Sequence, residues 1–536
     1  MSSPDLAHAS DHHQIRQVLN LIPNTKQAFF IRFGGKLTAI QQKAIPLIVA
    51  GQNVVIAAAT ASGKTEAVVA PTIERLLKER WTGMSVLYIV PTRALANDLT
   101  ERVAPPLNDL QLCVETKHGE SPTLKKTPFQ MLITTPESLD SLLCRQAERL
   151  KQVRTVILDE IHLLDNTYRG DQLRVLLERL KQVATQPFNV HLVSATLGNP
   201  HDIASRYTQK YELVSVAGQR EIDEYFIPDL DSLQVEARRR GWKKLLVFCN
   251  KRQRVEETTQ QLCQSWKTHR IVAHHGSLAR AEREESERAM KEQPYVVCVA
   301  TSTLEIGVDI GDIDCVVLRD PPWSITALQQ RIGRGNRRSG RIQVAFIPED
   351  SVQQAYMAAM LDTARQGKVV VKDYVPDLSV CVQQIFSLTY QYRTGVTLEQ
   401  VRKFLAPLAR CDEIDVIVHH LINEGWLEKR RGLICASTKL MDMGERGMIH
   451  SNIPDALEYR VIERPSNREV GRISGTFDSV FLLAGRAWRV LRVEDTVIYV
   501  ELYREKSHSA LFKPSTELGK FFSYLPRNMQ QRALRS

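Results

Sequence analysis

Residues 58–65 read Ala-Ala-Thr-Ala-Ser-Gly-Lys-Thr and follow the short apolar run Val54–Ala57. Such a run is typical of a buried strand in a parallel sheet, and the residues after the loop can open a helix. A loop of small residues at a helix start cradles phosphates, because backbone N–H groups and the helix dipole meet the anion. Lys64 would reach the terminal phosphates, and the Thr65 hydroxyl would bind Mg²⁺. The residues predicted to contact the nucleotide here are Ala61, Ser62, Gly63, Lys64, Thr65 and Glu66.

A pair of carboxylates follows a later apolar run, Thr155–Leu158. In a site that hydrolyses a nucleotide, Asp159 would hold Mg²⁺ and Glu160 would orient the attacking water. Each signal also has an ordinary alternative. The loop has Ala58 where the usual motif has glycine, and Asp-Glu after a strand is often a solvated turn. The order of the two signals and their positions behind strands favour a site that hydrolyses ATP.

The bulk composition fits a multidomain globular protein. The 536 residues are enough for about three or four domains. No apolar run approaches the ~18 residues of a membrane-spanning helix, and the start of the chain lacks a signal-peptide pattern. The nine cysteines are scattered, as in proteins with reduced thiols. We therefore expect a cytoplasmic protein without a membrane partner, and the net charge of +10 favours polyanionic partners.

Apolar strands alternate with helical stretches twice along the chain, which predicts an α/β protein with two parallel-sheet lobes. The expected strands of the first lobe are Val54–Ala57, Val86–Val90, Met131–Thr134, Thr155–Leu158 and Asn189–Val193. Those of the second are Lys244–Phe248, His269–Ala273, Tyr295–Val299, Asp314–Leu318 and Gln343–Ile347, after a linker over residues 217–229. The predicted domains are a mobile tail (1–20), the first lobe (21–217), the second lobe (218–365), a winged helix (366–437) and a small β-rich domain (438–536).

Three short helices followed by a hairpin predict the winged helix. Thr397 and Gln400 form a capping box at the start of the second helix, and the hairpin tip at residues 429–432 is basic. A generic three-helix module is the alternative. Beyond it, short strands predict a small sheet or partial barrel. The expected strand pairs are Val470–Ile473 with Val480–Leu483, and Trp488–Val493 with Val497–Tyr503.

The motifs between residues 30 and 340 resemble those of the superfamily 2 helicases. Gln41 precedes Lys64 at the spacing of the family's Q motif. By this resemblance the Gln41 amide would read the adenine edge, and Phe33 would stack on the adenine ring. An isolated glutamine would carry no such meaning. The resemblance also implies that the two lobes are RecA-like and that both contribute to one ATP pocket.

Residues 329–338 read Gln-Gln-Arg-Ile-Gly-Arg-Gly-Asn-Arg-Arg and resemble motif VI of that family. By this match Arg334 and Arg337 would be arginine fingers, because guanidinium groups suit the charge that develops on a transferred phosphoryl group. A basic cluster is otherwise usually a solvated face. The resemblance places three further residues near the nucleotide: Gly307, Asp309 and Gln330.

Other motifs of the family would hold nucleic acid or couple it to hydrolysis. Contacts to one strand, made to its phosphates, are expected from Thr92, Arg93, Thr135, His275, Gly276 and Thr301. Coupling between hydrolysis and lobe movement is expected from His162, Ser194 and Thr196. Backbone contacts of this kind predict binding that tolerates any sequence and weakens with salt.

Three features resemble the Lhr (large helicase-related) group, in a short form. They are residues 169–180 after the acidic pair, the winged helix directly after the second lobe, and Gly485-Arg486-Ala487-Trp488-Arg489-Val490. Trp488 would stack on a base by this resemblance, and simple burial in a strand is the alternative. The chain departs from the group at Asn336-Arg337, where Gly-His is frequent, and from its length we expect it to be without the extra C-terminal modules of long members.

The resemblance implies an ATP-dependent helicase or translocase that uses Mg²⁺. It would move 3′→5′ on single-stranded DNA and unwind DNA duplexes or RNA:DNA hybrids. An RNA helicase of RNA processing or decay is the alternative, because phosphate contacts do not distinguish the polymers. A regulatory protein that binds duplex sites and uses ATP as a switch is a second alternative. A nuclease fusion is disfavoured because the sequence shows no nuclease carboxylate cluster. No protein partner is predicted.

Overall fold

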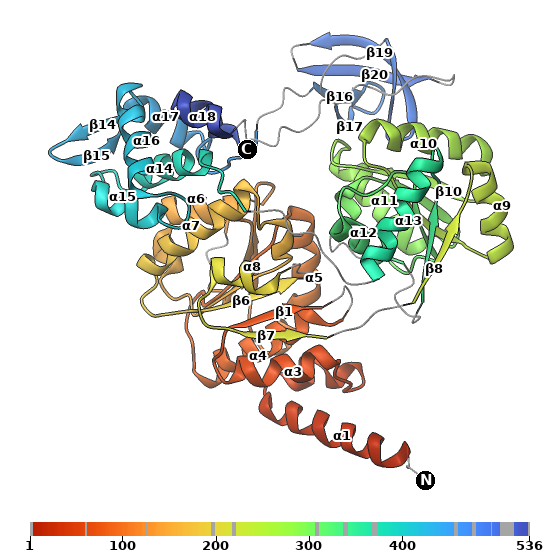
Figure 1. Cartoon of the computed structure of the whole chain (residues 1–536), viewed down its shortest axis with the longest axis horizontal. Helices are drawn as coiled ribbons and strands as arrows, with labels where there is room; N and C mark the ends of the chain where they lie inside the picture. Colours follow the sequence, from red (N-terminus) through yellow and green to blue (C-terminus); the bar gives the residue numbers. More distant parts are fainter. Residues whose placement is uncertain are drawn as a thin grey trace. The chain divides into compact units, whose positions relative to one another are not determined.

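The computed structural model describes residues 4–58, 62–121, 123–124, 127–194, 199–216, 221–305, 310–335, 341–365, 374–454, 459–473, 479–494, 496–503 and 519–533. The chain forms two compact units (Figure 1). Unit 1 comprises Met1–Ala217, Val371–Pro454 and Thr516–Ser536. Unit 2 comprises Gly218–Val370 and Asp455–Ser515. Each unit therefore combines one α/β lobe with a second module.

The lobe of unit 1 is built on a seven-stranded sheet with the strand order β3-β4-β2-β5-β6-β1-β7. All pairs in this sheet are parallel. The strands are β1 (Val54–Ala57), β2 (Val86–Ile89), β3 (Val114–Lys117), β4 (Met131–Thr134), β5 (Thr155–Leu158), β6 (Asn189–Ser194) and β7 (Glu212–Ser215). The five predicted strands are confirmed, and they are the inner ones because continuous apolar runs fit a strand buried on both faces. The edge strands β3 and β7 were not predicted.

Helices flank this sheet, and four of the long ones (α4, α5, α6 and α8) are the next described elements after its strands. The long helices are α3 (Ala39–Val49), α4 (Lys64–Lys78), α5 (Arg93–Asp109), α6 (Pro136–Arg145), α7 (Tyr168–Val183) and α8 (Pro200–Tyr207). Shorter turns are α2 (Lys26–Phe29), η1 (Ile31–Phe33), η2 (Ala147–Leu150) and η3 (Ile161–Leu163). Pro4–Leu21 form helix α1, which the sequence analysis did not predict. Val18 near its end is buried, as is Ile22 just beyond it. The mobility of residues 1–20 stays a prediction.

The winged helix belongs to unit 1. It contains α14 (Ser379–Gln391), α15 (Leu398–Leu405), α16 (Cys411–Asn423), α17 (Thr438–Glu445) and the hairpin β14 (Leu427–Arg430) with β15 (Leu433–Ala436). The capping box of Thr397 and Gln400 is present. The C-terminal elements η5 (Lys520–Tyr524) and α18 (Arg527–Ala533) share its core, and Figure 1 shows α18 beside α17. In this core Phe521 packs edge-on against Phe386. A β-rich domain over all of 438–536 is therefore wrong, since both of its ends are helical and belong to the winged helix.

The lobe of unit 2 has a six-stranded, fully parallel sheet with the order β10-β11-β9-β12-β13-β8. Its strands are β8 (Glu221–Phe226), β9 (Lys244–Phe248), β10 (Arg270–His274), β11 (Val296–Ala300), β12 (Cys315–Leu318) and β13 (Arg341–Phe346). Its helices are α9 (Leu230–Arg240), α10 (Arg252–Ser265), α11 (Arg280–Glu292), η4 (Ser302–Leu304), α12 (Ile325–Ile332) and α13 (Ser351–Arg365). The predicted linker is partly wrong, because its middle forms the edge strand β8.

The small β domain of unit 2 has the strand order β17-β16-β20-β19-β18. The strands are β16 (Tyr459–Glu463), β17 (Arg468–Ile473), β18 (Val480–Leu483), β19 (Arg486–Glu494) and β20 (Val497–Tyr503). The predicted pairing of Trp488–Val493 with Val497–Tyr503 is confirmed. The pairing of Val470–Ile473 with Val480–Leu483 is wrong, because β17 pairs with β16 and β18 turns directly into β19 through Ala484-Gly485.

Within the described residues, no helix has the length and apolar character needed to span a membrane. None of the nine cysteines, all of which lie in described segments, forms a disulfide.

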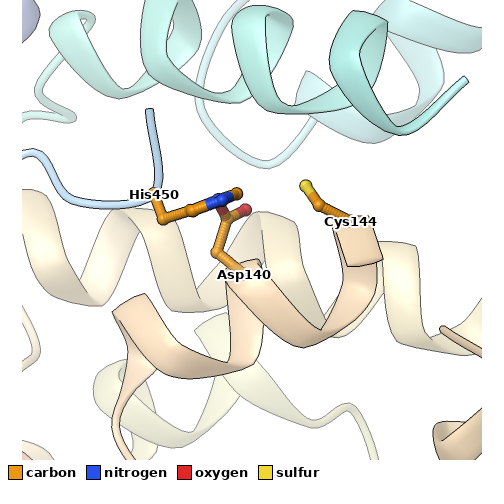
Figure 2. Close-up of side chains that lie close together, drawn as sticks. All are labelled: Asp140, Cys144 and His450. Atoms are coloured by element: carbon orange, nitrogen blue, oxygen red, sulfur yellow. The ribbon is translucent and has the colours of Figure 1, made fainter. Parts of the chain in front are cut away.

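A buried polar cluster joins the lobe of unit 1 to its winged helix (Figure 2). Asp140 and Cys144 lie on α6, and His450 lies just after α17, with its Nδ1 2.9 Å from Asp140 Oδ2. Carboxylate, thiol and imidazole atoms this close could suggest a metal site. Arg179 already supplies the positive charge, since its Nη1 donates to Asp140 Oδ1 at 2.7 Å and its Nη2 lies 3.5 Å from Cys144 Sγ. We therefore interpret the cluster as a docking network.

This network predicts a pH-dependent stability of unit 1. Burial alone would lower the pKa of His450, but its hydrogen bond to Asp140 raises the pKa to about 9. A raised pKa stabilises the fold while His450 is protonated, so this contribution is complete below about pH 6.5 and is lost as the pH rises through about 9. The effect is on the order of 3 kcal/mol at most.

Thermal unfolding followed between pH 6.5 and 9.5 measures this effect. The midpoint temperature of unfolding of unit 1 should fall as the pH rises in the wild-type protein. It should fall much less in His450→Gln. His201→Gln, at an exposed position on α8, is the control and should keep the wild-type slope. Parallel slopes in all three proteins would contradict a protonated His450.

Candidate functional site

The phosphate loop leads from β1 into α4 with Gly63 at the helix N-cap. Gly63 has a left-handed φ of 80°, and a Cβ at this position would collide with the amide of Gln41. Both facts require glycine. Lys64 is buried and its Nζ donates to the carbonyl of Ala58 at 2.9 Å. Thr65 and Ser62 are half-buried at the start of the helix. Glu66 accepts from Arg102 Nη2 at 3.2 Å, and Ala61 lies outside the described residues.

Helix α3 is tied to the phosphate loop by its capping box. Gln41 Oε1 accepts from the Thr38 N–H at 2.9 Å, and Gln41 Nε2 donates to the Gly63 carbonyl at 3.2 Å. The Thr38 hydroxyl donates to the Ser62 carbonyl at 2.8 Å. Phe33 is 74% exposed, with the Arg32 guanidinium 5.4 Å from its ring centroid. Gln41 is thus brought to the loop, and the Phe33 ring is available for stacking.

The acidic pair lies at the carboxyl end of β5. Asp159 Oδ2 accepts from the Tyr88 hydroxyl at 2.8 Å, and Asp159 Oδ1 accepts from the Glu160 N–H at 2.8 Å. Glu160 has a left-handed φ of 44°, and its Oε1 lies 3.9 Å from Lys64 Nζ. Burial, followed by the neighbouring charge of Glu160, raises the pKa of Asp159 to about 6. Tyr88, on the adjacent strand β2, is a site residue that sequence reasoning missed.

This donor set fits a divalent cation. Buried Asp159 and half-buried Glu160 lie beside the ammonium group of Lys64, so the pocket holds more negative than positive charge when both acids are ionised. Burial and then the charge of Glu160 raise the pKa of Asp159, and a bound cation would offset both effects. Hard oxygen ligands are those that Mg²⁺ prefers. Asp159 and Thr65 are the residues that would hold it.

His162 connects the acidic pair with β6. Its Nδ1 lies 2.7 Å from the Ser194 hydroxyl and 3.4 Å from Glu160 Oε2. Burial lowers the pKa of His162, so the ring is neutral at physiological pH. The structure therefore brings His162, Ser194 and Glu160 together, whereas Thr196, the third residue predicted to couple hydrolysis to movement, lies outside the described residues. The coupling role of His162 and Ser194 stays a prediction.

Three predicted nucleic-acid residues of unit 1 lie at helix starts on the same sheet edge. The Thr92 hydroxyl accepts from the Leu95 N–H and caps α5. Arg93 is exposed and its Nη1 lies 3.1 Å from Glu120 Oε1. Thr135 is buried before α6. Only Arg93 of these presents a charged side chain to solvent, so Thr92 and Thr135 would contribute through backbone and short polar groups.

In unit 2 the corresponding loops follow β10 and β11. The His275 side chain is buried, and its Nε2 lies 2.7 Å from Glu256 Oε1. Gly276 beside it is exposed. Thr301 is buried, and its hydroxyl lies 3.4 Å from that of Thr303. The backbone of His275 and Gly276, rather than the imidazole, is what this loop can offer to a ligand.

Glu256 also holds the β domain against the lobe. It accepts from the N–H groups of Ala484 and Gly485 at 2.7 and 2.6 Å. Both of these residues have positive φ, so the turn between β18 and β19 points its N–H groups at the carboxylate. Sequence reasoning missed Glu256, because nothing local to α10 marks it.

Helix α12 carries the first residues of motif VI, and Arg334 follows its end. Gln330 is buried. Arg331 donates through Nε to Glu305 Oε1 at 2.6 Å and through Nη2 to Asn250 Oδ1 at 2.9 Å. Arg334 is 1% exposed and its Nη2 donates to the Glu305 carbonyl at 2.7 Å. Here Arg334 faces its own unit. The predicted residues Gly307, Asp309 and Arg337 lie outside the described residues.

Trp488 corrects one expectation. The indole is 1% exposed, packs in the core shared by the lobe and the β domain, and donates from Nε1 to the Leu483 carbonyl at 2.8 Å. A ring buried on both faces, with its N–H already bonded, is unavailable to a base. Burial, the alternative that the sequence left open, is what the structure shows.

Comparison with known proteins agrees with this arrangement. A DEAD/DEAH box helicase domain matches residues 38–203, and a helicase conserved C-terminal domain matches residues 228–339. The chain belongs to the superfamily 2 helicases. The helicase motifs inferred from the sequence therefore lie within the two matched segments, apart from Phe33 just before them.

Relatives of this chain confirm the resemblance to the Lhr group. The ATP-dependent helicase Lhr-Core protein 2 of Thermococcus barophilus is 26% identical over 90% of this chain and 64% of its own length. Lhr-Core of Sulfolobus acidocaldarius is 27% identical over 87% of this chain and 60% of its own length. The structure of Mycobacterium smegmatis Lhr bound to ssDNA and AMP-PNP superposes with a TM-score of 0.70 at 25% identity, covering 81% of this chain and 62% of that one. The chain thus spans less than two thirds of each of these relatives.

The buried carboxylate of Glu256, which joins the lobe to the β domain, gives a testable expectation. Glu256→Gln removes a charge that accepts from two N–H groups, and hydrogen bonds to charged groups contribute roughly 1.5–3 kcal/mol each. Hydrogen exchange at the Ala484 and Gly485 amides should therefore accelerate at least tenfold, read by mass spectrometry. Glu284→Gln, in an exposed pair with Arg280, should leave those amides unchanged. Equal exchange in the two variants would show that Glu256 does not hold the turn.

Proposed function

We propose that this chain is an ATP-dependent helicase or translocase. The observation that carries the proposal is the cluster of Gly63, Lys64, Asp159 and Glu160 at one sheet edge, with His162 and Ser194 behind it. Bound Mg²⁺ would neutralise charge on the β- and γ-phosphates. Thr65 and Asp159 would hold it, Lys64 would bind the terminal phosphates, and Glu160 would orient the water. Phe33 and Gln41 would position the adenine.

The second unit would supply the arginine of the reaction. Arg334 and Arg337 are the proposed fingers, with Gln330, Gly307 and Asp309 beside the nucleotide. Arg334 would have to leave the Glu305 carbonyl to reach a phosphate. Hydrolysis would therefore depend on both units acting together, which links ATP turnover to movement of the units.

The nucleic acid would be a single strand held by its phosphates. Thr92, Arg93 and Thr135 in unit 1 would share this strand with the His275-Gly276 backbone and Thr301 in unit 2. The relative from Mycobacterium smegmatis binds ssDNA, which supports DNA as the polymer. We propose that the protein is cytoplasmic. We also propose that it moves 3′→5′ along the bound strand and unwinds DNA duplexes or RNA:DNA hybrids. An RNA helicase is the rival, since phosphate contacts serve either polymer.

ATP turnover should be lost when either the phosphate-binding lysine of unit 1 or the proposed arginine finger of unit 2 is replaced. Lys64→Ala should abolish ATP hydrolysis, and Arg334→Ala should lower kcat by roughly 10³-fold or more. Both should bind ssDNA within about twofold of the wild type, because their proposed contacts are to ATP. Phosphate release with and without ssDNA measures turnover, and fluorescence anisotropy measures binding.

Lys78→Ala at the exposed end of α4 and Arg341→Ala at the start of β13 are the matched controls. Both should retain turnover. If Arg334→Ala kept near-normal ssDNA-stimulated turnover, the second unit would not supply the proposed arginine.

The polymer and the direction can be tested in one assay. Strand displacement with ATP should be seen on substrates that carry a 3′ single-stranded DNA tail and be absent with a 5′ tail. It should weaken steeply between low and moderate salt, because the contacts are to phosphates. Displacement with an RNA tail alone would replace the DNA proposal with the RNA one.

A further inference from the structure

The loop between β12 and α12 carries a solvent-exposed tryptophan. Trp323 is 75% exposed, whereas Trp242, Trp266 and Trp488 are buried. It directly precedes Ser324, whose hydroxyl caps α12 by accepting from the Ala327 N–H at 3.1 Å. An apolar residue at this position usually packs on the fourth residue of the helix. That residue, Leu328, is fully buried, so the Trp323 ring gains little from such a contact.

The loop that carries the indole is braced at Asp320 and Pro321. The Asn250 N–H donates to Asp320 Oδ2 at 2.7 Å, and Asn250 Nδ2 donates to the Pro321 carbonyl at 2.7 Å. Arg254 Nε lies 3.3 Å from Asp320 Oδ1. Pro322, next to Trp323, is buried. A ring on such a braced loop loses little conformational entropy on binding a ligand.

The position of the loop suggests the ligand. β12 neighbours β9 in the parallel sheet, and β9 neighbours β11. The Trp323 loop therefore lies on the same carboxyl edge as Thr301, two strand spacings or roughly 10 Å away. Between them, after β9, lies the exposed Lys251. Surfaces that bind single-stranded nucleic acid combine exposed aromatic rings with basic residues and loops that contact phosphates. The edge around Trp323 combines the same features.

We propose that Trp323 stacks on a base of the single strand whose phosphates the adjacent loops hold. The proposal rests on the proposed function and adds a base contact to it. Stacking suits a translocase because every base has a π-face, so contact does not depend on sequence. The adenine of ATP is a less suitable occupant, since the exposed Phe33 of unit 1 already offers a ring beside the phosphate loop.

The test compares Trp323→Ala, Trp323→Phe and the wild type with two oligonucleotides. One is a single-stranded DNA with bases, and the other has the same length but abasic sites. Trp323→Ala should bind the base-containing strand at least about fivefold more weakly, since stacking is worth about 1 kcal/mol or more per base. Trp323→Phe should retain most of the affinity. On the abasic strand all three proteins should bind alike.

Tyr356→Ala removes another exposed aromatic ring, on α13 of the same unit, and should change neither affinity. Equal binding of wild type and Trp323→Ala to the base-containing strand would overturn the inference. So would an equal loss on both strands, or a raised KM for ATP with unchanged DNA binding, which would assign the ring to the nucleotide. A wild type that binds no single strand would instead reject the proposed function itself.

Discussion

Parallel strand pairing is the constraint on which the whole site depends. Every pair in the two large sheets is parallel, so all carboxyl ends of a sheet share one edge. The loops at that edge are forced together although they are far apart in sequence. In unit 1 this places Lys64 near Glu160, and in unit 2 it places Asn250 against Pro321. The chemistry of the site follows from strand direction before any particular side chain is chosen.

Each unit joins its lobe to a second module through buried carboxylates. Asp140 receives hydrogen bonds from Arg179 and Ser387 and contacts His450, whereas Glu256 receives them from two turn N–H groups and contacts His275. A buried charge is costly unless it is well paired, and removing one partner is more costly still. The modules are therefore fixed in one orientation, because any other docking would leave these charges unpaired. Apolar packing alone would be less selective.

The sequence predicted the inner strands, the winged helix and the phosphate loop, because each has a strong local pattern. Of the edge strands, the apolar β10 was predicted, whereas β3, β7 and β8 were missed for a physical reason. β3 reads Val-Glu-Thr-Lys and β8 reads Glu-Ile-Asp-Glu-Tyr-Phe, since an edge strand is only partly buried and tolerates charge.

Contacts between residues that are far apart along the chain could not be predicted from the sequence either. The Ala484-Gly485 turn lacks the Asn-Gly signal of a tight hairpin, so the pairing of β18 was misassigned. Tyr88 and Glu256 act on residues that are distant along the chain, and Phe521 returns to a core that begins with α14. Trp488 was predicted to stack on a base because of its motif, but its burial makes the ring unavailable for that contact.

Glu305 is where nucleic-acid binding and catalysis would meet in unit 2. It follows the short turn η4, which starts directly after Thr301, and it binds both described arginines of motif VI. Its side chain fixes Arg331, and its carbonyl holds Arg334. Only three residues separate Thr301 from Glu305, so a nucleic-acid strand that displaced Thr301 would also move Glu305. It would thereby change the position of the carbonyl that accepts from Arg334 and keeps it turned inward. Such a link would connect occupancy of the nucleic-acid loop to release of the catalytic arginine without any contact between the two ligands.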